Sequence, residues 1–239
     1  LNSKRANELF DAITYERFKV VEKLLSSGLS ANVVDEFGQT PLFRIVYNKT
    51  PTQVNFLRLF ISHGAEVNFK RPDDGITPLF FAKGDALKVL IENGADLSAR
   101  SNKGASPIHY ASRLEDVKVL LEKGLDINDT NYNLSTPLHG YVYSDSSLLK
   151  FCIDNGAKLD AKDVTGWTPL MCLARTEYVT EKSELLEVIT KAEYLIKAGA
   201  DVTITDNDGM TAYDHAILVD SHDFAKWLKD ISDGKQHTT

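Results

Sequence analysis

The chain has 239 residues and a formal net charge of −7, with 43% hydrophobic and 26% charged residues. No cluster of lysine and arginine stands out, which argues against a nucleic-acid-binding surface, because such surfaces concentrate positive charge. No apolar run reaches the length of about 18 residues that a spanning helix needs, so we expect no membrane insertion.

The first predicted elements are two helices at the N-terminus. Their apolar residues recur at three- and four-residue spacing, which places one apolar stripe on each helix. These residues are Leu9, Phe10 and Ile13, followed by Val20, Val21, Leu24 and Leu25. We interpret residues 1–34 as a terminal helix pair that shields one end of whatever follows.

From Thr40 onward a tetrapeptide, Thr-Pro-Leu-Phe, recurs with small changes. Its copies begin at Thr40, Thr77, Ser106, Thr136 and Thr168, and a degenerate copy begins at Thr211. Thr or Ser is a good helix N-cap, and Pro fits the first helical turn. Each copy therefore predicts a short first helix, for example from Pro41 to about Asn48 and from Pro107 to about Arg113.

A second helix is predicted after each tetrapeptide. In the first repeat its apolar residues are Val54, Leu57, Phe60 and Ile61, again with helical spacing. A glycine then ends each helix, because glycine adopts the left-handed conformation without steric cost. These glycines are Gly64, Gly94, Gly124, Gly156 and Gly199. The polar stretch that follows, with a glycine two residues before the next Thr or Ser, predicts a projecting turn.

Two motifs that stay in phase over five units indicate stacked copies of one structural unit. The order of helix, turn, helix, Gly-Ala-Asp and a turn of the form Asp-x-x-Gly-x-Thr-Pro-Leu resembles the ankyrin repeat. The segments from Asp35 and from Asp163 match it closely, and the resemblance extends from about Asn2 to Ser232.

The resemblance implies an all-α ankyrin-repeat solenoid of helix-turn-helix units with projecting turns and a capping helix pair at each end. We predict a single domain over residues 1–239. Its parts are an N-terminal cap at 1–34, five repeats at 35–205, a C-terminal cap at 206–232 and a flexible tail at 233–239.

Three departures from the family pattern carry predictions. The units that begin at Thr77 and Ser106 lack residues that normally link the two helices, so their first helices should be clipped. The fifth unit has an insertion near 178–191 in helical phase, which predicts an elongated second helix. Leu134 stands where a turn glycine belongs, so that turn should be distorted.

No motif for catalysis, metal binding or phosphate binding is present, so we predict a non-enzymatic protein without cofactor or metal. His109 and His139 hold the motif position at which the family's histidine braces adjacent turns. Cys152 and Cys172 are expected to be buried small apolar residues, although a disulfide stays open. A remote alternative is an enzyme with a cryptic site near the histidines and Cys172.

In proteins similar to this one, partners contact the projecting turns and first helices, which line a concave groove. Exposed large apolar residues at turn tips and residues near the ends of first helices are therefore the candidate partner-binding residues. The turn-tip candidates are Phe37, Ile76, Tyr132, Trp167 and Met210, and the helix-end candidates are Tyr47, Arg113, Tyr143 and Arg175. Taken singly, each could instead pack against the adjacent turn.

The expected function is a protein–protein interaction module that binds a partner protein through this groove and its turn tips. An alternative is a dedicated inhibitor that occludes the active site of a partner enzyme. Acidic turn residues (Glu36, Asp73, Asp74 and Asp208) favour a basic partner, but acidity can also serve solubility alone. We expect a soluble monomer, either cytoplasmic or exported with a signal peptide removed before Leu1.

Overall fold

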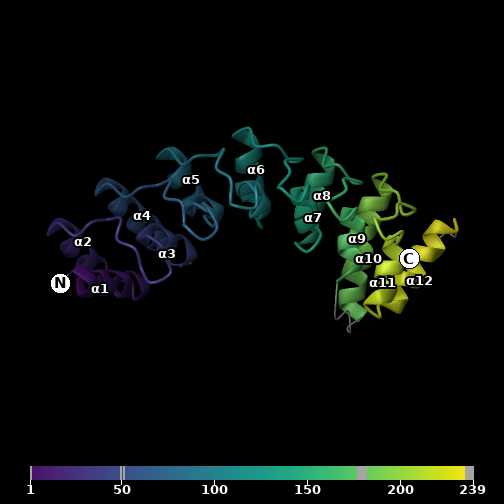
Figure 1. Cartoon of the computed structure of the whole chain (residues 1–239), viewed down its shortest axis with the longest axis horizontal. Coiled ribbons are helices and arrows are strands. Elements are labelled where there is room, and N and C mark those ends of the chain that lie inside the picture. The colour runs from purple at the N-terminus through teal and green to yellow at the C-terminus, as the bar shows by residue number, and fades with distance from the viewer. Residues whose placement is uncertain (1, 49, 51, 177–181, 235–239) are drawn as a thin grey trace. The chain divides into compact units, whose positions relative to one another are not determined.

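The computed structural model describes residues 2–48, 50, 52–176 and 182–234 (Figure 1). The described residues form helices and connecting turns, without a β-strand among them. They divide into two compact units, unit 1 at residues 1–123 and unit 2 at residues 124–239. The all-α ankyrin-repeat architecture predicted from the repeats is confirmed, whereas the flexible tail predicted at 233–239 lies mostly outside the described residues.

Unit 1 is built from consecutive pairs of a first and a second helix. Its two short η elements are single 3₁₀ turns that take the place of a first helix. In chain order the pairs are α1 (Asn2–Thr14) with α2 (Phe18–Ser26), α3 (Pro41–Tyr47) with α4 (Gln53–Ser62), η1 (Pro78–Phe80) with α5 (Asp85–Glu92), and η2 (Pro107–His109) with α6 (Leu114–Glu122).

Unit 2 continues the same alternation, and each of its first elements is an α-helix instead of a 3₁₀ turn. In chain order its elements are α7 (Pro137–Tyr141), α8 (Ser146–Asp154), α9 (Pro169–Ala174), α10 (Lys182–Lys197), α11 (Ala212–Leu218) and α12 (His222–Ser232). The elongated helix predicted in the insertion is confirmed in α10, which has 16 residues. The start of that insertion, residues 178–181, lies outside the described residues.

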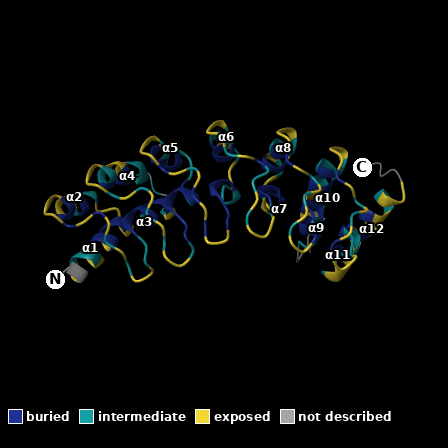
Figure 2. Cartoon of the chain, turned by 45° about the horizontal axis from the view of Figure 1, so that its top comes forward, coloured by how far each residue is buried: buried dark blue, intermediate teal, exposed yellow. Residues whose placement is uncertain are grey.

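Within each unit, first helices pack on neighbouring first helices and second helices pack on neighbouring second helices. In unit 1, α3 contacts α1 and η1, and α4 contacts α5; in unit 2, α9 contacts α7 and α11, and α10 contacts α8 and α12. The faces between neighbours are buried, whereas many residues of the connecting turns are exposed (Figure 2). Each core is therefore continuous from repeat to repeat, as expected when no helix pair can bury its stripe alone.

The clipping of two first helices is confirmed, and it is stronger than the sequence indicated. The helix predicted from Pro107 to about Arg113 ends at His109, after a single 3₁₀ turn. The physical reason is chain length: α6 already begins at Leu114, so residues 110–113 are needed to reverse the chain direction.

The distortion predicted at Leu134 is wrong. Leu134 adopts φ = 58°, close to the 67° of Gly38 at the matching place in another turn. Its N–H donates to the Asn131 carbonyl at 2.9 Å, and Asn131 Oδ1 accepts from the N–H of Asn133 and Ser135. Because these hydrogen bonds hold the turn, Leu134 is kept in a left-handed conformation that costs roughly 1–2 kcal/mol.

Asparagine side chains connect successive repeats at the C-terminal ends of the second helices. Asn32 Nδ2 donates to the Gly64 carbonyl at 3.0 Å, and Asn32 Oδ1 accepts from the Glu66 N–H at 2.7 Å. The same double contact recurs from Asn68 to the Gly94 segment and, in unit 2, from Asn128 to the Gly156 segment. Helix ends that would leave carbonyls without partners are thus satisfied by the preceding repeat.

Candidate binding surface

Two repeats of unit 1 place a phenylalanine where other repeats have histidine. Phe43 and Phe80 are buried, and together with Ile76 and Ala99 they form an apolar cluster. Phe69, Phe81 and Tyr110 pack against that cluster from a partly exposed position. Without a histidine, the Thr40 and Thr77 hydroxyl oxygens are buried and have no hydrogen-bond partner within the described residues. Packing of aromatic rings therefore replaces polar bracing here.

Three aromatic side chains, which we call the aromatic row, lie along the edge of this cluster: Tyr47, Phe81 and Tyr110. The ring centroids of Tyr47 and Phe81 are 4.6 Å apart, and those of Phe81 and Tyr110 are 5.8 Å apart. Both distances fall in the range of favourable aromatic pairs. Tyr47 is 45% exposed, so the row presents part of its aromatic surface to solvent.

Arg71 packs on the aromatic row and on the cluster behind it. Its guanidinium carbon lies 5.6 Å from the Phe43 ring centroid and 5.8 Å from that of Phe81. Arg71 Nε donates to Asp74 Oδ1 at 3.0 Å. This hydrogen bond lowers the pKa of Asp74 and raises that of Arg71. Asp74 is therefore engaged inside unit 1, and its role in selecting a basic partner stays a prediction.

The clipped first helices leave a hollow beside the aromatic row. This groove, which we call the unit 1 groove, has a volume of about 1090 Å³. It lies at the start of the second helices α4, α5 and α6, and its lining includes Tyr47, Phe81, Lys83, Arg113 and Asp116. In a full-length repeat the last turn of the first helix would occupy part of this space.

A buried carboxylate lies in the lining of the unit 1 groove. Asp116, in the first turn of α6, has a side chain that is only 4% exposed, and its Oδ1 accepts from the Gly84 N–H at 2.8 Å. Arg113 Nε is 3.9 Å from the other oxygen, Oδ2, which has no hydrogen-bond partner within the described residues. Arg113 precedes α6 rather than ending a first helix, because η2 is so short.

Unit 2 uses the histidine that the two repeats of unit 1 lack. His139 Nδ1 accepts from the Thr136 N–H at 3.1 Å, and His139 Nε2 lies 3.1 Å from the Trp167 carbonyl in the next repeat. The two contacts assign the proton to Nε2. Burial lowers the pKa of His139, which favours this neutral form. The bracing role predicted for His139 is therefore confirmed.

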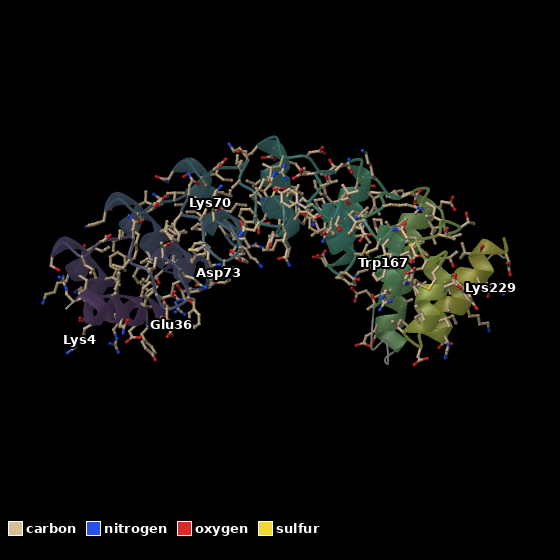
Figure 3. The ribbon with its side chains drawn as sticks, in the orientation of Figure 1. Lys4, Glu36, Lys70, Asp73, Trp167 and Lys229 are labelled. Carbon is tan, nitrogen blue, oxygen red and sulfur yellow. The ribbon has the colours of Figure 1, made fainter. Side chains whose placement is uncertain are left out.

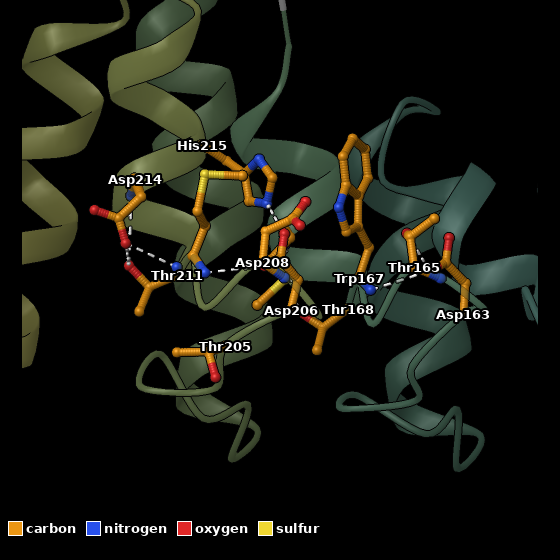
Figure 4. Close-up of polar contacts among 12 residues, drawn as sticks. Asp163, Thr165, Trp167, Thr168, Thr205, Asp206, Asp208, Thr211, Asp214 and His215 are labelled. Atoms are coloured by element: carbon orange, nitrogen blue, oxygen red, sulfur yellow. Dashed lines mark hydrogen bonds and ion pairs between the residues drawn. The ribbon is translucent and has the colours of Figure 1, made fainter.

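Trp167 is half-buried among residues of unit 2 (Figure 3). The Arg175 guanidinium carbon lies 5.0 Å from the Trp167 ring centroid, and the His215 ring packs edge-on against Trp167 at 4.8 Å. His215 Nε2 is 2.8 Å from Asp206 Oδ2, and both side chains are fully buried (Figure 4). Desolvation raises the pKa of Asp206, but hydrogen bonds from Met210 and His215 outweigh it, so the net shift is downward.

Unit 2 also exposes two tyrosines. Tyr132 is 74% exposed on a turn, and Tyr143, which follows α7, is 56% exposed. The Tyr143 hydroxyl donates to the Cys172 carbonyl at 2.6 Å, while burial raises the Tyr143 pKa to about 12. The hydroxyl thus anchors a ring whose remaining surface is open to solvent.

The remaining candidates differ in exposure. Phe37 is 61% exposed on its turn, and Met210 is half-buried. The exposure expected for Ile76 is wrong: the side chain is 3% exposed and belongs to the apolar cluster with Phe43 and Phe80. The Ile76 side chain packs inward against Phe43, Phe80 and Ala99, so it is not available at the turn surface.

Sequence reasoning missed Phe81, Arg71 and Asp116. A signal existed for the aromatic row: Phe81 and Tyr110 both stand four residues after the first residue of their tetrapeptide. In the clipped repeats, Phe81 and Tyr110 at this position contribute the rings of the aromatic row, as Tyr47 does at the end of the longer helix α3. Nothing in the sequence distinguished Asp116 from other acidic residues at a helix start.

Cys152 and Cys172 are both buried thiols, and burial raises the pKa of each to about 12. Within the described part of the chain no group of three or more His, Cys, Asp and Glu side chains is placed to hold a metal ion. None of the helices formed by those residues is long and apolar enough to span a bilayer.

The sequence profile described as ankyrin repeats (3 copies) matches residues 9–100, 52–131 and 138–238. The chain therefore belongs to the ankyrin-repeat family, whose repeats generally mediate protein–protein interaction. Proteins of this family are typically non-enzymatic interaction modules.

Individual relatives share the repeats but not the overall length. The chain is 31% identical over 197 residues to neurogenic locus notch homolog protein 1 of Xenopus laevis. The matched segment makes up 77% of the chain and 6% of that protein. It is 35% identical over 85 residues to the ankyrin repeat and KH domain-containing protein mask-1 of Caenorhabditis elegans, covering 34% of the chain and 3% of that protein. An ankyrin repeat-containing protein of Schizosaccharomyces pombe is 34% identical over 88 residues, which cover 36% of the chain and 40% of that protein.

Proposed function

We propose that this chain is a non-enzymatic module that binds a partner protein through exposed aromatic residues on its turns and first helices. The supporting observation is the exposure of Phe37, Tyr47, Tyr132 and Tyr143, which range from 45% to 74%. Large apolar side chains left open to water in this number are typical of interaction surfaces. Tyrosine is also enriched among residues that dominate binding energy.

The proposed partner presents a basic surface. The net charge of −7 and the exposed acidic residues Glu36 and Asp73 on turns of unit 1 support this choice (Figure 3). Asp208 is a similar exposed acid on a turn of unit 2. Complementary charge accelerates encounter and disfavours wrong partners, so the association rate should fall as salt rises.

Trp167, Arg175 and Met210 remain candidates for contact with the partner. All three are half-buried, and Trp167 and Arg175 contact each other, so truncating them would perturb folding together with binding. Tyr47, Tyr132 and Tyr143 are therefore better probes of the surface.

The test is affinity capture with the full chain as bait. The variants are Tyr47→Ala and the double variant Tyr132→Ala with Tyr143→Ala, and the control is Tyr15→Ala, an aromatic that is 67% exposed but outside the candidate set. We expect a partner recovered by the wild type and by the control to be reduced with both test variants. Equal recovery by all four proteins would remove these tyrosines from the binding surface.

Two roles fit such binding, and a captured enzyme separates them. An inhibitor that occludes an active site would abolish turnover when it saturates the enzyme, whereas an adaptor would leave turnover unchanged. We expect the chain on its own to be a monomer without turnover. The raised pKa of Cys172, about 12, supports the absence of thiol chemistry, because the reactive thiolate is scarce at neutral pH.

A further inference from the structure

We propose that the unit 1 groove binds a lysine or arginine side chain of an extended partner segment, with Asp116 as its acceptor. This inference rests on the proposed protein-binding function and assigns one subsite within it. Three features carry it: a groove of about 1090 Å³, a buried carboxylate oxygen in its lining without a hydrogen bond, and two aromatic rings elsewhere in the same lining.

The first step concerns the carboxylate. Asp116 Oδ1 is satisfied by the Gly84 N–H, but Oδ2 is buried and has no hydrogen-bond donor within the described residues. A buried carboxylate oxygen without a donor is unfavourable, since it has lost water and gained no replacement. A partner group that donates to Oδ2 therefore recovers an interaction that the free chain lacks.

The second step concerns Arg113, the cation that now stands closest to this oxygen. Its Nε is 3.9 Å from Asp116 Oδ2, which is too far for a hydrogen bond, and its side chain is 53% exposed. The guanidinium passes over Gly84, where a Cβ atom would come within 3.0 Å of Arg113 Nη1. Arg113 thus covers the carboxylate loosely, and a partner cation can take its place.

The third step concerns the sign of the ligand's charge. The other carboxylates of the lining, Asp85 and Glu115, are already paired with Lys88 and Lys118 at 3.3 and 2.8 Å. The lining also includes Lys83, whose ammonium donates to Ser112 Oγ at 3.0 Å, so the preference for a cation comes from the buried Asp116 oxygen and not from the net charge of the groove.

The fourth step concerns the walls. Tyr47 and Phe81 line the groove with ring centroids 4.6 Å apart. Aromatic faces attract cations, and the methylene stem of a lysine or arginine packs well against them. Arg71 already uses Phe81 in this way from within the chain, with its guanidinium carbon 5.8 Å from the ring centroid.

The experiment selects ligands for the full chain from a library of random twelve-residue peptides displayed on phage. Enriched peptides are then synthesised with a fluorescein label, and their affinities are measured by fluorescence anisotropy. The proteins compared are the wild type, Asp116→Asn, Arg113→Ala and a control, Glu122→Gln. The control removes one exposed carboxylate from the same helix outside the groove.

We expect the wild type to enrich peptides with a lysine or arginine flanked by apolar residues. Their affinity should fall at least about tenfold with Asp116→Asn, stay unchanged with Glu122→Gln, and stay equal or rise with Arg113→Ala. Three results would overturn the proposal: no enrichment on the wild type, enrichment of acidic peptides that require Arg113, or basic peptides that bind Asp116→Asn equally well.

Two further measurements keep the test decisive if Asp116→Asn fails to fold. Tyr47→Ala should weaken the same peptides, because it removes an exposed wall of the groove. In the wild type, peptide binding should shift the NMR amide signal of Gly84, which donates to Asp116. A partner captured equally by the wild type and Asp116→Asn would end this inference while leaving the protein-binding function in place.

Discussion

Two tetrapeptides of unit 1 carry Phe43 and Phe80 at the fourth position and the third carries His109, whereas unit 2 carries His139 and Met171 there. In unit 2 the imidazole bonds to Thr136 and to the Trp167 carbonyl, so polar groups of two repeats satisfy one another. In unit 1 the rings build an apolar cluster, and the threonine hydroxyls next to them stay without partners within the described residues. The fourth position thus distinguishes the hydrogen-bonded repeats at His139 from the aromatic packing at Phe43 and Phe80.

The two regions also differ in what they leave open. Unit 2 has α-helices, α7 and α9, as first helices, and adds the long helix α10. Unit 1 reduces two first helices to single 3₁₀ turns, and the missing turns coincide with a groove beside the aromatic row. Two shortened repeats of unit 1 thus border a groove while their helices still contact the neighbouring repeats.

The largest expected effect concerns a turn of unit 2. Gly166→Ala should destabilise the chain by about 2–4 kcal/mol, because Gly166 has φ = 83° and a Cβ would lie 2.8 Å from the Asn207 backbone nitrogen. Gly209→Ala is the matched control: it has a similar φ of 79° but open space around it, so only the conformational cost of about 1–2 kcal/mol should appear. Urea denaturation measures the free energy of unfolding of both variants. Equal losses for Gly166→Ala and Gly209→Ala would contradict the close approach of Asn207 to Gly166.

His139→Phe replaces a hydrogen-bonded histidine of unit 2 with the residue type that two repeats of unit 1 carry at the same position. It leaves the Thr136 N–H and the Trp167 carbonyl without their imidazole partner, which should cost about 1–3 kcal/mol in the free energy of unfolding. Thermal denaturation followed by circular dichroism checks this value. A neutral or stabilising effect would show that the bracing hydrogen bonds do not distinguish the two units.

Asp206→Asn tests the buried pair with His215 and should cost about 1–2 kcal/mol at neutral pH. Because the pKa of Asp206 is lowered in the folded chain, its contribution is complete above the unfolded pKa of about 3.9 and disappears as pH falls through the folded value. The difference between wild type and variant should therefore shrink in acid. Asp208→Asn, on the same turn but exposed, is the control, and a difference independent of pH would refute the assignment.

The smallest expected effect is an increase in stability. Leu134→Gly should stabilise the chain by about 1 kcal/mol, because glycine adopts φ = 58° without the strain that leucine carries there. Greater freedom of glycine in the unfolded chain reduces this gain. Chemical denaturation of both proteins provides the measurement, and a loss of stability would mean that the leucine side chain contributes packing.

The sequence was sufficient for what repeats and local chemistry determine. Pro41 and Gly64 predicted where a first helix starts and a second helix ends, and the insertion predicted the long helix α10. It failed where tertiary context decides. Leu134 adopts the turn conformation because Asn131 accepts hydrogen bonds from the turn, and Ile76 packs into the apolar cluster with Phe43 and Phe80. Asp116 became visible only when the fold placed Gly84 and Arg113 around it.

We propose that the clipped repeats of unit 1 provide the surface on which a partner docks. Hydrogen–deuterium exchange of the full chain, with and without a captured partner, tests this directly. We expect partner binding to slow exchange in segments 81–88 and 110–117, which border the groove. Protection confined to the far ends of the second helices, such as Gly64 and Gly94, with none at the groove, would contradict the account.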